Sequence, residues 1–456
     1  MPAQISASGK QGAPITLAGP ETGQAILDGG GIPQDARNIG LKPLDGEFAF
    51  LKIFNAQRIV LRGLTFTNNW PSSIYLRGAS DIIIQNCDFE RGRFAIYARQ
   101  GRKIKTQRLL IEDCTWTQDP EHRLWSGEIT WENVKSQQSS NDASHFNGAF
   151  FGSYNISGDV TIRSCKIQHA FNGIRMDMDK SLIEKRSNDD LKIPRNRDVA
   201  IYDNDFSFIR DNAVEPENGA DSWFVYNNRF LNIHGTFSLD QVICQDMFYL
   251  GNTILNNRKP EQGNTDRSGG VIFKFFKATD EDDNPPLAHR TTLWSAYNSV
   301  QTRTSYVKKG ATMFWRDAYN AVGLYNGDHP DVTKPPRVAF TKFGWKHGDV
   351  EVRGMATNDP DYPQAYPEDK VFDDGVNCTG APFQITDTTP DPDAPLGGWN
   401  GQLKKSRALT GVKCPALRIT RLHGRDFHVP AGLSPGAHPI KELYCNFGDS
   451  VALPRI

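Results

Sequence analysis

The sequence predicts an all-β fold, a right-handed parallel β-helix, in which short strands wind into coils that stack along one axis. The first observation is a period: Asn204, Asn228 and Asn252 each follow a run of alternating apolar residues and lie 24 residues apart. The second is the alternation itself, which gives each strand one buried and one exposed face. A fixed period built from strands is typical of a solenoid. The third is another strand nine or ten residues after most of these positions, with the inward residues Ile74, Ile96, Ile174, Val214 and Phe237.

The position of these asparagines recurs along the chain, and we interpret it as a corner between two strands. Asparagine tolerates a left-handed backbone there, and its amide can hydrogen-bond to the asparagines of the coils above and below. Cysteine takes the same position in the earlier coils, so we expect stacked, buried thiols rather than metal ligands. The corner residues are Leu64, Cys87, Cys114, Cys165, Asn204, Asn228, Asn252 and Asn298.

The remaining elements follow from this repeat. Residues 13–30 form an opening strand pair and a glycine-rich turn. In the coils that carry insertions, Ala149 and Val271 are expected at the inward position of the second strand. Pro216 also falls inward in this strand, and because it has no N–H for the ladder we expect a local irregularity.

Long polar insertions cluster around the second strand. We expect them to form the walls of a groove, because loops that gather at one strand of a solenoid commonly build its binding face. The alternative is that they are tolerated surface insertions. They comprise residues 117–147, 179–197, 256–269 and 277–290.

The repeat suggests two parts of the chain. Residues 1–330 form the β-helix, which would be the catalytic domain. The period is lost after about residue 330, and residues 331–456 are predicted to cap and wrap the end of the helix, whose strand edges must be covered. A small separate β-domain is the alternative for this segment.

Composition and charge argue against several classes of protein. The net charge of −1 predicts neither a nucleic-acid-binding surface nor a polybasic membrane surface. No apolar run approaches the roughly 18 residues of a membrane-spanning helix. The first residues, MPAQISASGKQGAPITL, lack the pattern of a signal peptide. The sequence leaves the disulfide state of three further cysteines open: Cys378, Cys414 and Cys445.

Two outward columns result when the second strand is stacked coil on coil. Like charges stacked at about 4.8 Å raise one another's pKa, so three carboxylates on successive coils predict a functional cleft, with a solvated charged face as the alternative. A register slip of one residue would turn these side chains inward. The first column reads Tyr75, Tyr97, Phe150, Arg175, Glu215, Ser238 and Ile272, and the second reads Arg77, Arg99, Gly152, Asp177, Glu217, Asp240 and Lys274.

The second column suits the hydrolysis of a glycosidic bond. Carboxylates one coil apart lie near the about 5 Å of a retaining glycosidase, and two coils apart they approach the inverting range. Asp177, Glu217 and Asp240 could therefore supply an acid and a base or nucleophile, with Glu215 and Asp179 in reserve. Arg175 could hold a substrate carboxylate or sulfate. The residues expected to contact sugar are Tyr75, Tyr97, Arg99, Phe150, Trp125, Trp131 and Lys274, the aromatic ones by stacking on sugar rings or, equally, by packing against neighbouring coils.

Two other functions remain open. A lyase that acts on a uronate needs a cation, a base and often Ca²⁺ held by carboxylates. Arg175 or Lys274 could be the base or the neutralising cation, and Asp177, Glu217 and Asp240 the Ca²⁺ ligands; the hydrolase needs no metal. The chain could also be a non-catalytic glycan-binding protein or a tailspike-like adhesin.

Several segments carry a resemblance to a known superfamily. The segments GAPITLAGPETGQAILDGGG, GI-x-M, DNAV-x-PENG and WFVYNNRF, with the corners of the N/C-x-F kind, resemble right-handed parallel β-helix proteins of the pectin-lyase-like superfamily over residues 13–330. The resemblance implies a carbohydrate-active protein with its site on the outward face of one strand column. The series NTD…DD…GHG, WIDH and DPHD, which mark particular families, are absent, so no catalytic residue is carried over.

These observations predict a polysaccharide-degrading enzyme that binds its substrate in an extended groove. We favour a glycoside hydrolase with paired carboxylates over a lyase, because three carboxylates stand against few well-placed cations. The expected partner is a polysaccharide or oligosaccharide, which could be anionic. This substrate class implies a secreted or periplasmic protein, although the chain shows no signal peptide.

Overall fold

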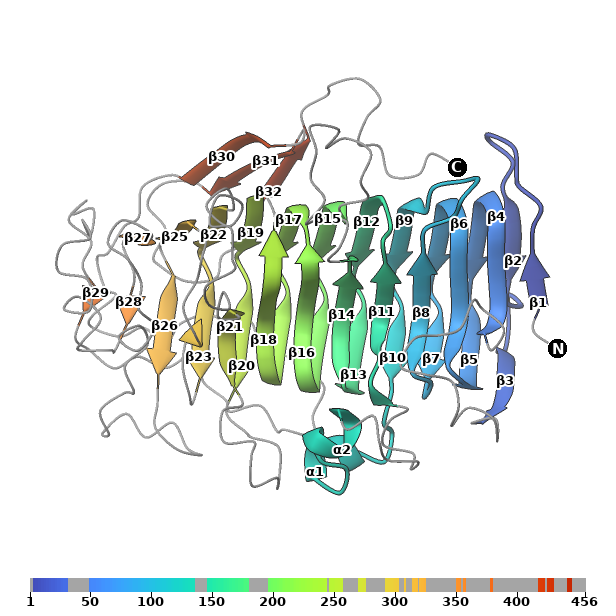
Figure 1. Ribbon diagram of the computed structural model, residues 1–456, viewed down its shortest axis with the longest axis horizontal. Coiled ribbons are helices and arrows are strands. Elements are labelled where there is room, and N and C mark those ends of the chain that lie inside the picture. The colour runs from blue at the N-terminus through green and yellow to red at the C-terminus, as the bar shows by residue number, and fades with distance from the viewer. Residues whose placement is uncertain are drawn as a thin grey trace.

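The computed structural model describes most of the first 300 residues and shorter pieces beyond them. In it the strands wind into an elongated solenoid with one main axis (Figure 1). The described residues are 3–31, 49–135, 146–179, 196–243, 246–256, 270–275, 292–302, 307–308, 314–318, 320–324, 350–353, 356–357, 378–379, 417–422, 425–429 and 441–444.

Each complete coil contributes a strand to three parallel sheets, which confirms the predicted fold class. The strands pair with those of the neighbouring coils and in parallel throughout the solenoid. We name the sheets by their place around the corner. The pre-corner sheet contains β2 (Ile15–Ala18), the second halves of β4 (Ala49–Arg62) and β6 (Ser72–Gln85), β9 (Gln107–Glu112), β12 (Gly158–Arg163), β15 (Arg197–Tyr202), β17 (Asp221–Tyr226), β19 (Asp246–Leu250), β22 (Thr292–Ala296), β25 (Phe314–Ala318) and β27 (Val350–Arg353).

The other two sheets follow the corner. The post-corner sheet contains β3 (Ala25–Gly31), β5 (Leu64–Asn69), β7 (Asp88–Glu90), β10 (Thr115–Thr117), β13 (Lys166–Ala170), the first halves of β16 (Asp205–Gly219) and β18 (Arg229–Ile243), β20 (Thr253–Asn256), β23 (Ser299–Thr302), β26 (Ala321–Leu324), β28 (Ala356–Thr357) and β29 (Cys378–Thr379). The site sheet contains β1 (Ala3–Ile5), the first halves of β4 and β6, β8 (Phe94–Arg99), β11 (Ala149–Tyr154), β14 (Asn172–Asp177), the second halves of β16 and β18, β21 (Val271–Phe275) and β24 (Val307–Lys308).

The corner asparagines form the predicted ladder. The amide of Asn204 donates to the side-chain oxygen of Asn228 at 3.0 Å, and Asn228 donates to Asn252 at 3.1 Å. The ladder continues through Asn298 to Asn320, a further member that was not predicted from the sequence. The left-handed backbone lies one residue earlier than expected, on Asp203 and Asn227 rather than on the corner itself. The side-chain amide of each corner asparagine can then point along the axis of the solenoid toward the next coil.

The thiols take their predicted place in the core. Cys87, Cys114 and Cys165 are buried and free, and the backbone N–H of Cys165 donates to the side-chain oxygen of Asn204 at 2.9 Å, which places both on one ladder. Cys378 lies in β29 without a described side chain, and Cys414 and Cys445 fall outside the described residues, so their disulfide state stays open.

The interior is a continuous stack of like residues on successive coils. Ile74 pairs with Ile96, and Ile174 with Val214, as the second register predicts. Two members of that register are wrong by two residues: Phe151 and Phe273, not Ala149 and Val271, pair with the inward residues of the neighbouring coils. Both β11 and β21 begin after a long insertion, and the sequence spacing does not give the residue at which the register resumes.

The inserted segment 117–135 folds against the edge of the solenoid. It contains two short helices, α1 (Arg123–Ser126) and α2 (Trp131–Lys135), which lie beside β13 and β16 (Figure 1). Its apolar residues form a small core of their own with Phe171, and the buried Arg210 donates from Nε to the carbonyl oxygen of Leu124 at 3.0 Å. The other predicted groove walls lie almost entirely outside the described residues.

A stack of two histidines and one phenylalanine fixes this segment to β13 and β16. The rings of His122 and His169 lie 3.6 Å apart and nearly parallel, and Phe208 covers the other face of His169 at 4.8 Å. Burial, followed by the nearby His122, lowers the pKa of His169 to about 3. His169 is therefore neutral in the folded protein at neutral pH.

We expect this stack to make stability sensitive to acid. The folded pKa of His169 lies below the unfolded value, so its contribution is present above about pH 6.5 and is lost as the pH falls toward 3. The test variant is His169→Asn, because asparagine tolerates the left-handed backbone at this position. As the pH falls from 6.5 to 4.5, the unfolding free energy of the wild type should drop by about 2–3 kcal/mol more than that of His169→Asn. Urea unfolding at both pH values tests this, with the exposed Lys103→Met as control. Parallel pH curves for wild type and His169→Asn would contradict it.

Strand pairing does not stop where the sequence period is lost. β27, β28 and β29 continue the parallel sheets past residue 330, as far as Thr379. Three further strands, β30 (Leu417–Leu422), β31 (Arg425–Val429) and β32 (Lys441–Tyr444), form a separate antiparallel sheet. The division into a β-helix of residues 1–330 and a cap of residues 331–456 stays a prediction. Among the described residues, no helix is long and apolar enough to cross a membrane.

Candidate functional site

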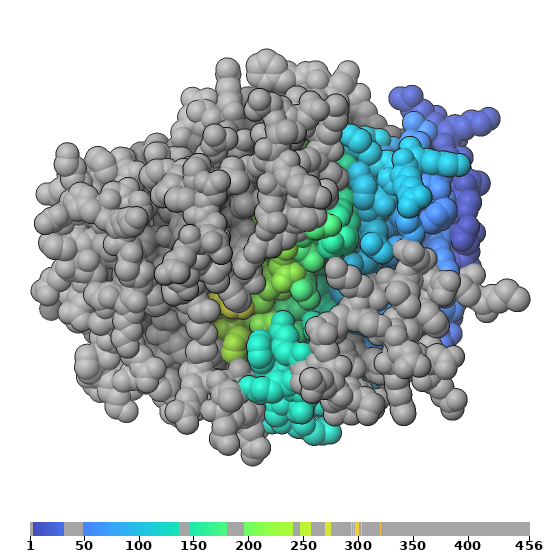
Figure 2. Space-filling model, viewed as in Figure 1, coloured from blue at the N-terminus to red at the C-terminus, as the bar shows by residue number. Residues whose placement is uncertain are grey.

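The site sheet brings the predicted acidic residues together. Arg175 on β14 pairs with Glu215 on β16, and Asp177 pairs with Glu217. Glu217 pairs in turn with Asp240 on β18, whose side chain lies outside the described part of the chain. The backbone register of the three-carboxylate column is therefore as predicted. Figure 2 shows the green coils that carry it at the surface, next to the teal segment with α1 and α2.

The ends of the two columns differ from the prediction. Lys274 stands opposite Ser238 and so belongs to the first column, in the place predicted for Ile272. Tyr154 stands between Arg99 and Asp177 in the second column, and Gly152 lies beside Tyr97 in the first. A Cβ on Gly152 would lie 2.5 Å from the ring of Phe94, so only glycine fits there. Each change is the two-residue offset found in β11 and β21.

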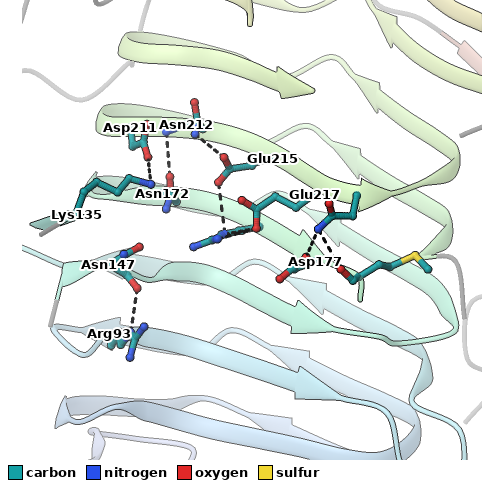
Figure 3. A network of polar contacts seen from close by, with 12 residues as sticks. Arg93, Lys135, Asn147, Asn172, Asp177, Asp211, Asn212, Glu215 and Glu217 are labelled. Carbon is teal, nitrogen blue, oxygen red and sulfur yellow. Dashed lines mark hydrogen bonds and ion pairs between the residues drawn. The ribbon is translucent and has the colours of Figure 1, made fainter. Parts of the chain in front are cut away.

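Arg175 holds two carboxyl groups at once. Its Nε and Nη2 donate to Oε2 of Glu217 at 2.8 and 2.6 Å, and its Nε lies 3.6 Å from Oε2 of Glu215 (Figure 3). Burial raises the pKa of Glu217, and the guanidinium opposes this rise. Arg175 thus pairs with acidic residues of its own site, where the sequence predicted a ligand for a substrate carboxylate or sulfate.

Glu215 is the most strongly perturbed carboxyl group of this cluster. The residue is 3% exposed, and its Oε1 accepts a hydrogen bond from Nδ2 of Asn212 at 2.7 Å. Its Oε2 is buried without a hydrogen-bond partner. Burial, together with the negative charge of Glu217, raises its pKa to about 7. A carboxyl group that is half protonated near neutral pH can donate or accept a proton there.

Asp177 lies in a more polar setting on the adjacent strand. Its Oδ1 accepts a hydrogen bond from Nδ2 of Asn218 at 2.9 Å, and the side chain is half-buried. The same amide donates to the carbonyl oxygen of Met178 at 3.0 Å. Asn218 has a left-handed backbone, which turns its amide back toward β14. The two contacts hold the Asp177 carboxyl group beside Glu217.

A second part of the network was not predicted from the sequence. Lys135, the last residue of α2, places Nζ 2.8 Å from Oδ2 of the buried Asp211. Next to it, the backbone N–H of Asn212 donates to Oδ1 of Asn172 at 3.0 Å (Figure 3). A signal for these residues was present in the segment DNAVEPENG, which carries acidic or amide residues besides Glu215 and Glu217, all on one strand. Lys135 had no such signal, because it comes from the insertion.

Most of the predicted sugar-stacking aromatics are packed against protein. Tyr75 and Tyr97 are 1% and 5% exposed and stack on each other at 6.2 Å. Phe150 was expected to point outward, and this is wrong: it is 0% exposed in the core, where Phe89 and Trp116 contact it. An apolar ring at the start of a strand gains more from burial than from following the alternation.

Two predicted sugar-binding tryptophans lie in the insertion, and one arginine lies on the column. Trp125 is buried and packs edge-on against Phe208 at 5.4 Å. Trp131 is half-buried, with Nζ of Lys135 5.4 Å from its ring centroid. Arg99 lies over the ring of Tyr154 at 5.5 Å. Trp131, Arg99 and Lys274 remain half-buried at the surface of the site, so their predicted role in binding sugar stays a prediction.

The candidate Ca²⁺ ligands are only partly described. Within the part of the chain that the structure describes, no three His, Cys, Asp or Glu side chains are grouped to hold a metal ion. The Ca²⁺ ligands considered for a lyase include Asp240, whose side chain is not described, so that set stays untested. Glu217 is already held by Arg175, which makes it a poor candidate for a Ca²⁺ ligand.

Comparison with known proteins bears on the fold. Residues 51–241 match the family described as the right handed beta helix region. No sequence among the curated proteins matches the chain significantly. A tailspike protein mutant of the E. coli bacteriophage HK620, in complex with a pentasaccharide, is similar in structure, with 8% identity and a TM-score of 0.43 over 79% of this chain and 70% of that chain.

A second solved structure is similar over the same share of the chain. It is a mannuronic acid specific polysaccharide family 6 lyase from human gut microbiota, with 12% identity and a TM-score of 0.42 over 79% of each chain. The family match spans β4 to most of β18 and therefore includes both strands of the candidate site. Residues 51–241 are a right-handed β-helix region, in agreement with the three parallel sheets and the corner ladder.

Proposed function

We propose that the protein is a carbohydrate-active enzyme that hydrolyses glycosidic bonds of a polysaccharide, with Glu215 as the general acid and Asp177 as the general base. The observation that carries the proposal is the state of Glu215: a buried carboxyl group with a pKa of about 7 and one oxygen without a hydrogen-bond partner. The sequence alone places Glu215 in reserve and favours Asp177, Glu217 and Asp240. The structure gives the reason for the change, because Glu217 is held by Arg175.

Glu215 has the properties that a general acid needs. An acid must be protonated at working pH and must still be acidic enough to give up its proton. Asn212 donates to Oε1, and Oε2 accepts no hydrogen bond, so we assign the proton that Glu215 transfers to Oε2. As the bond between the anomeric carbon and this oxygen breaks, the proton neutralises the leaving hydroxyl group.

Asp177 is placed to activate water for the same bond. It is the diagonal neighbour of Glu215, because it lies two residues beyond Arg175 on the adjacent strand. One coil across and two residues along a parallel sheet separate two backbone positions by about 8 Å. This spacing is compatible with the about 6.5–9.5 Å between the carboxyl groups of inverting glycosidases. Asp177 would take a proton from a water molecule that attacks the anomeric carbon from the face opposite Glu215. We therefore expect inversion of the anomeric configuration.

Arg175 and Glu217 support this pair. The guanidinium lies between the two glutamates and favours a charged Glu217, and that negative charge raises the pKa of Glu215. The ion pair therefore helps to keep the acid protonated while it fixes the side chain of Glu217 beside Asp177. A polysaccharide substrate also supports the proposal that the protein is exported to the periplasm or the medium.

A panel of acidic and neutral polysaccharides tests the proposed reaction. Each is assayed for new reducing ends and for the ultraviolet absorbance of unsaturated uronate, with and without EDTA. We expect reducing ends without absorbance and without an effect of EDTA. Both signals together, lost with EDTA, would replace the hydrolase by a Ca²⁺-dependent lyase. Tight glycan binding without either signal would identify a binding protein or adhesin.

A further inference from the structure

We propose that Lys135 is a positioning residue for Glu215, on which it acts both by its charge and through its contact with Asp211, the residue next to Asn212. The inserted segment 117–135 would then be part of the site rather than a neighbour of it. The inference rests on the proposed function, because it concerns the general acid of that site. It also gives a role to the ion pair between the half-buried Lys135 and the buried Asp211, which the proposed reaction does not use.

A continuous set of contacts joins the two residues. Nζ of Lys135 lies 2.8 Å from Oδ2 of Asp211, which directly precedes Asn212 in β16. The side chain of Asn212 donates to Oε1 of Glu215 at 2.7 Å, and its backbone N–H is fixed by Asn172 at 3.0 Å. A displacement of Asp211 would therefore move the residue that holds Glu215.

The ammonium group of Lys135 is held in place from more than one side. Its Nζ lies 5.4 Å from the ring centroid of Trp131 and 5.3 Å from that of Phe171. Cation–π contacts of this kind stabilise a cation more when it is removed from water. Burial lowers the pKa of Lys135, but the charges of Asp211 and Glu215 raise it further, so its net pKa is above the ordinary value. The lysine therefore stays charged.

The charges around Glu215 act on it in opposite directions. Glu217 and Asp211 raise its pKa, whereas Arg175 and Lys135 lower it. Burial alone would raise the pKa of Asp211, but the charges of Lys135, Lys274 and His234 outweigh it, and the pKa of Asp211 is lowered. Lys135 and Asp211 thus act on the pKa of Glu215 in opposite directions, so the loss of either charge alone should move it.

Infrared titration of Glu215 tests the proposal without any substrate. The carbonyl absorbance of protonated carboxyl groups is measured against pH, and the same spectrum of a matched Glu215→Gln protein is subtracted, so that Glu215 alone contributes. Lys135→Met should move the midpoint up by about half a unit to one unit of pH, and Asp211→Asn should move it down by a similar amount. Lys135→Arg should leave the midpoint unchanged, and the double variant Lys135→Met/Asp211→Asn should lie near the wild type.

The control is Lys103→Met, which removes the same charge from an exposed turn and should have no effect. If Lys135→Met does not fold because Asp211 is left without its partner, Asp211→Asn and the double variant still decide the question. Midpoints that do not move, or that move in the same direction in both single variants, would overturn the proposal. The titration needs no turnover, so it can confirm this inference even if the protein hydrolyses no polysaccharide. An active hydrolase whose midpoints do not move would refute this inference and leave the proposed function standing.

Discussion

Replacing Glu215 by glutamine should lower kcat on a polysaccharide by a factor of about 10²–10⁴, the range that general acid catalysis contributes. Glutamine keeps the acceptor oxygen for Asn212 and the shape of the side chain, but it has no proton to give. The fold and glycan binding should persist. The exposed Glu90→Gln serves as a control for loss of a carboxylate and should keep full activity.

The choice of leaving group separates an acid from a residue that merely binds. An aryl glycoside with an acidic phenol needs little protonation, so Glu215→Gln should lose far less activity on it than on the polysaccharide. Asp177→Asn should be impaired equally on both, because both need an activated water. Equal losses in Glu215→Gln on the two substrates would contradict the assignment of the acid.

The pH profile gives a second reading of the same residue. Because the acid must be protonated, kcat/KM of the wild type should fall as the pH rises through about 7, the pKa of Glu215. This decline should be absent from the residual activity of Glu215→Gln. A wild-type profile that is flat from about pH 6 to 8 would remove Glu215 from the reaction.

Replacing Asn228 by alanine should lower the free energy of unfolding by about 4 kcal/mol. The side-chain oxygen of Asn228 accepts from the backbone and the side chain of Asn204 at 3.1 and 3.0 Å. Its amide donates to Ile201 and to Asn252 at 2.9 and 3.1 Å. Alanine leaves these buried groups without partners, and each such group costs about 1–3 kcal/mol.

Urea unfolding at equilibrium measures this effect. The matched control is Thr115→Ala, because Thr115 also donates a side-chain hydrogen bond to a neighbouring coil, to Asp88, but on the exposed face of the post-corner sheet. It should change the unfolding free energy by less than about 0.5 kcal/mol. A loss below about 1 kcal/mol in Asn228→Ala would show that the ladder fills space without contributing its hydrogen bonds to stability.

The sequence contained most of what determines the coil. Strand pairing stacks equivalent positions of successive coils on one another. The spacing of 24 residues between Asn204, Asn228 and Asn252 was therefore enough to place them on one ladder. The errors lie where a coil is interrupted. Phe150 and Phe151 are both in the core, because β11 begins after a long insertion and the alternation starts anew there. A repeat with interruptions does not specify the residue at which it resumes.

The same limit applies to the site. The positions of Asp177 and Glu217 could be predicted because no insertion separates their strands from the preceding corner residue. The same register placed Arg175 opposite Glu215. Lys135 could not, because only the packing of Val134 and its neighbours against Phe171 brings α2 to the site sheet. The roles also could not be assigned from the column alone. Whether Glu215 or Glu217 is protonated depends on the burial of each and on which of them Arg175 contacts. Neither can be predicted from the spacing of residues in the sequence.

The products formed in heavy-oxygen water test the central claim most directly. Wild-type protein is incubated with the polysaccharide that gives the largest response in the panel, and the products are weighed by mass spectrometry. The account predicts that each cleavage adds one heavy oxygen atom at the new reducing end, and that Glu215→Gln forms almost no such product. Products that are lighter by one water and carry no heavy oxygen would show β-elimination and would contradict the hydrolase with Glu215 as its acid.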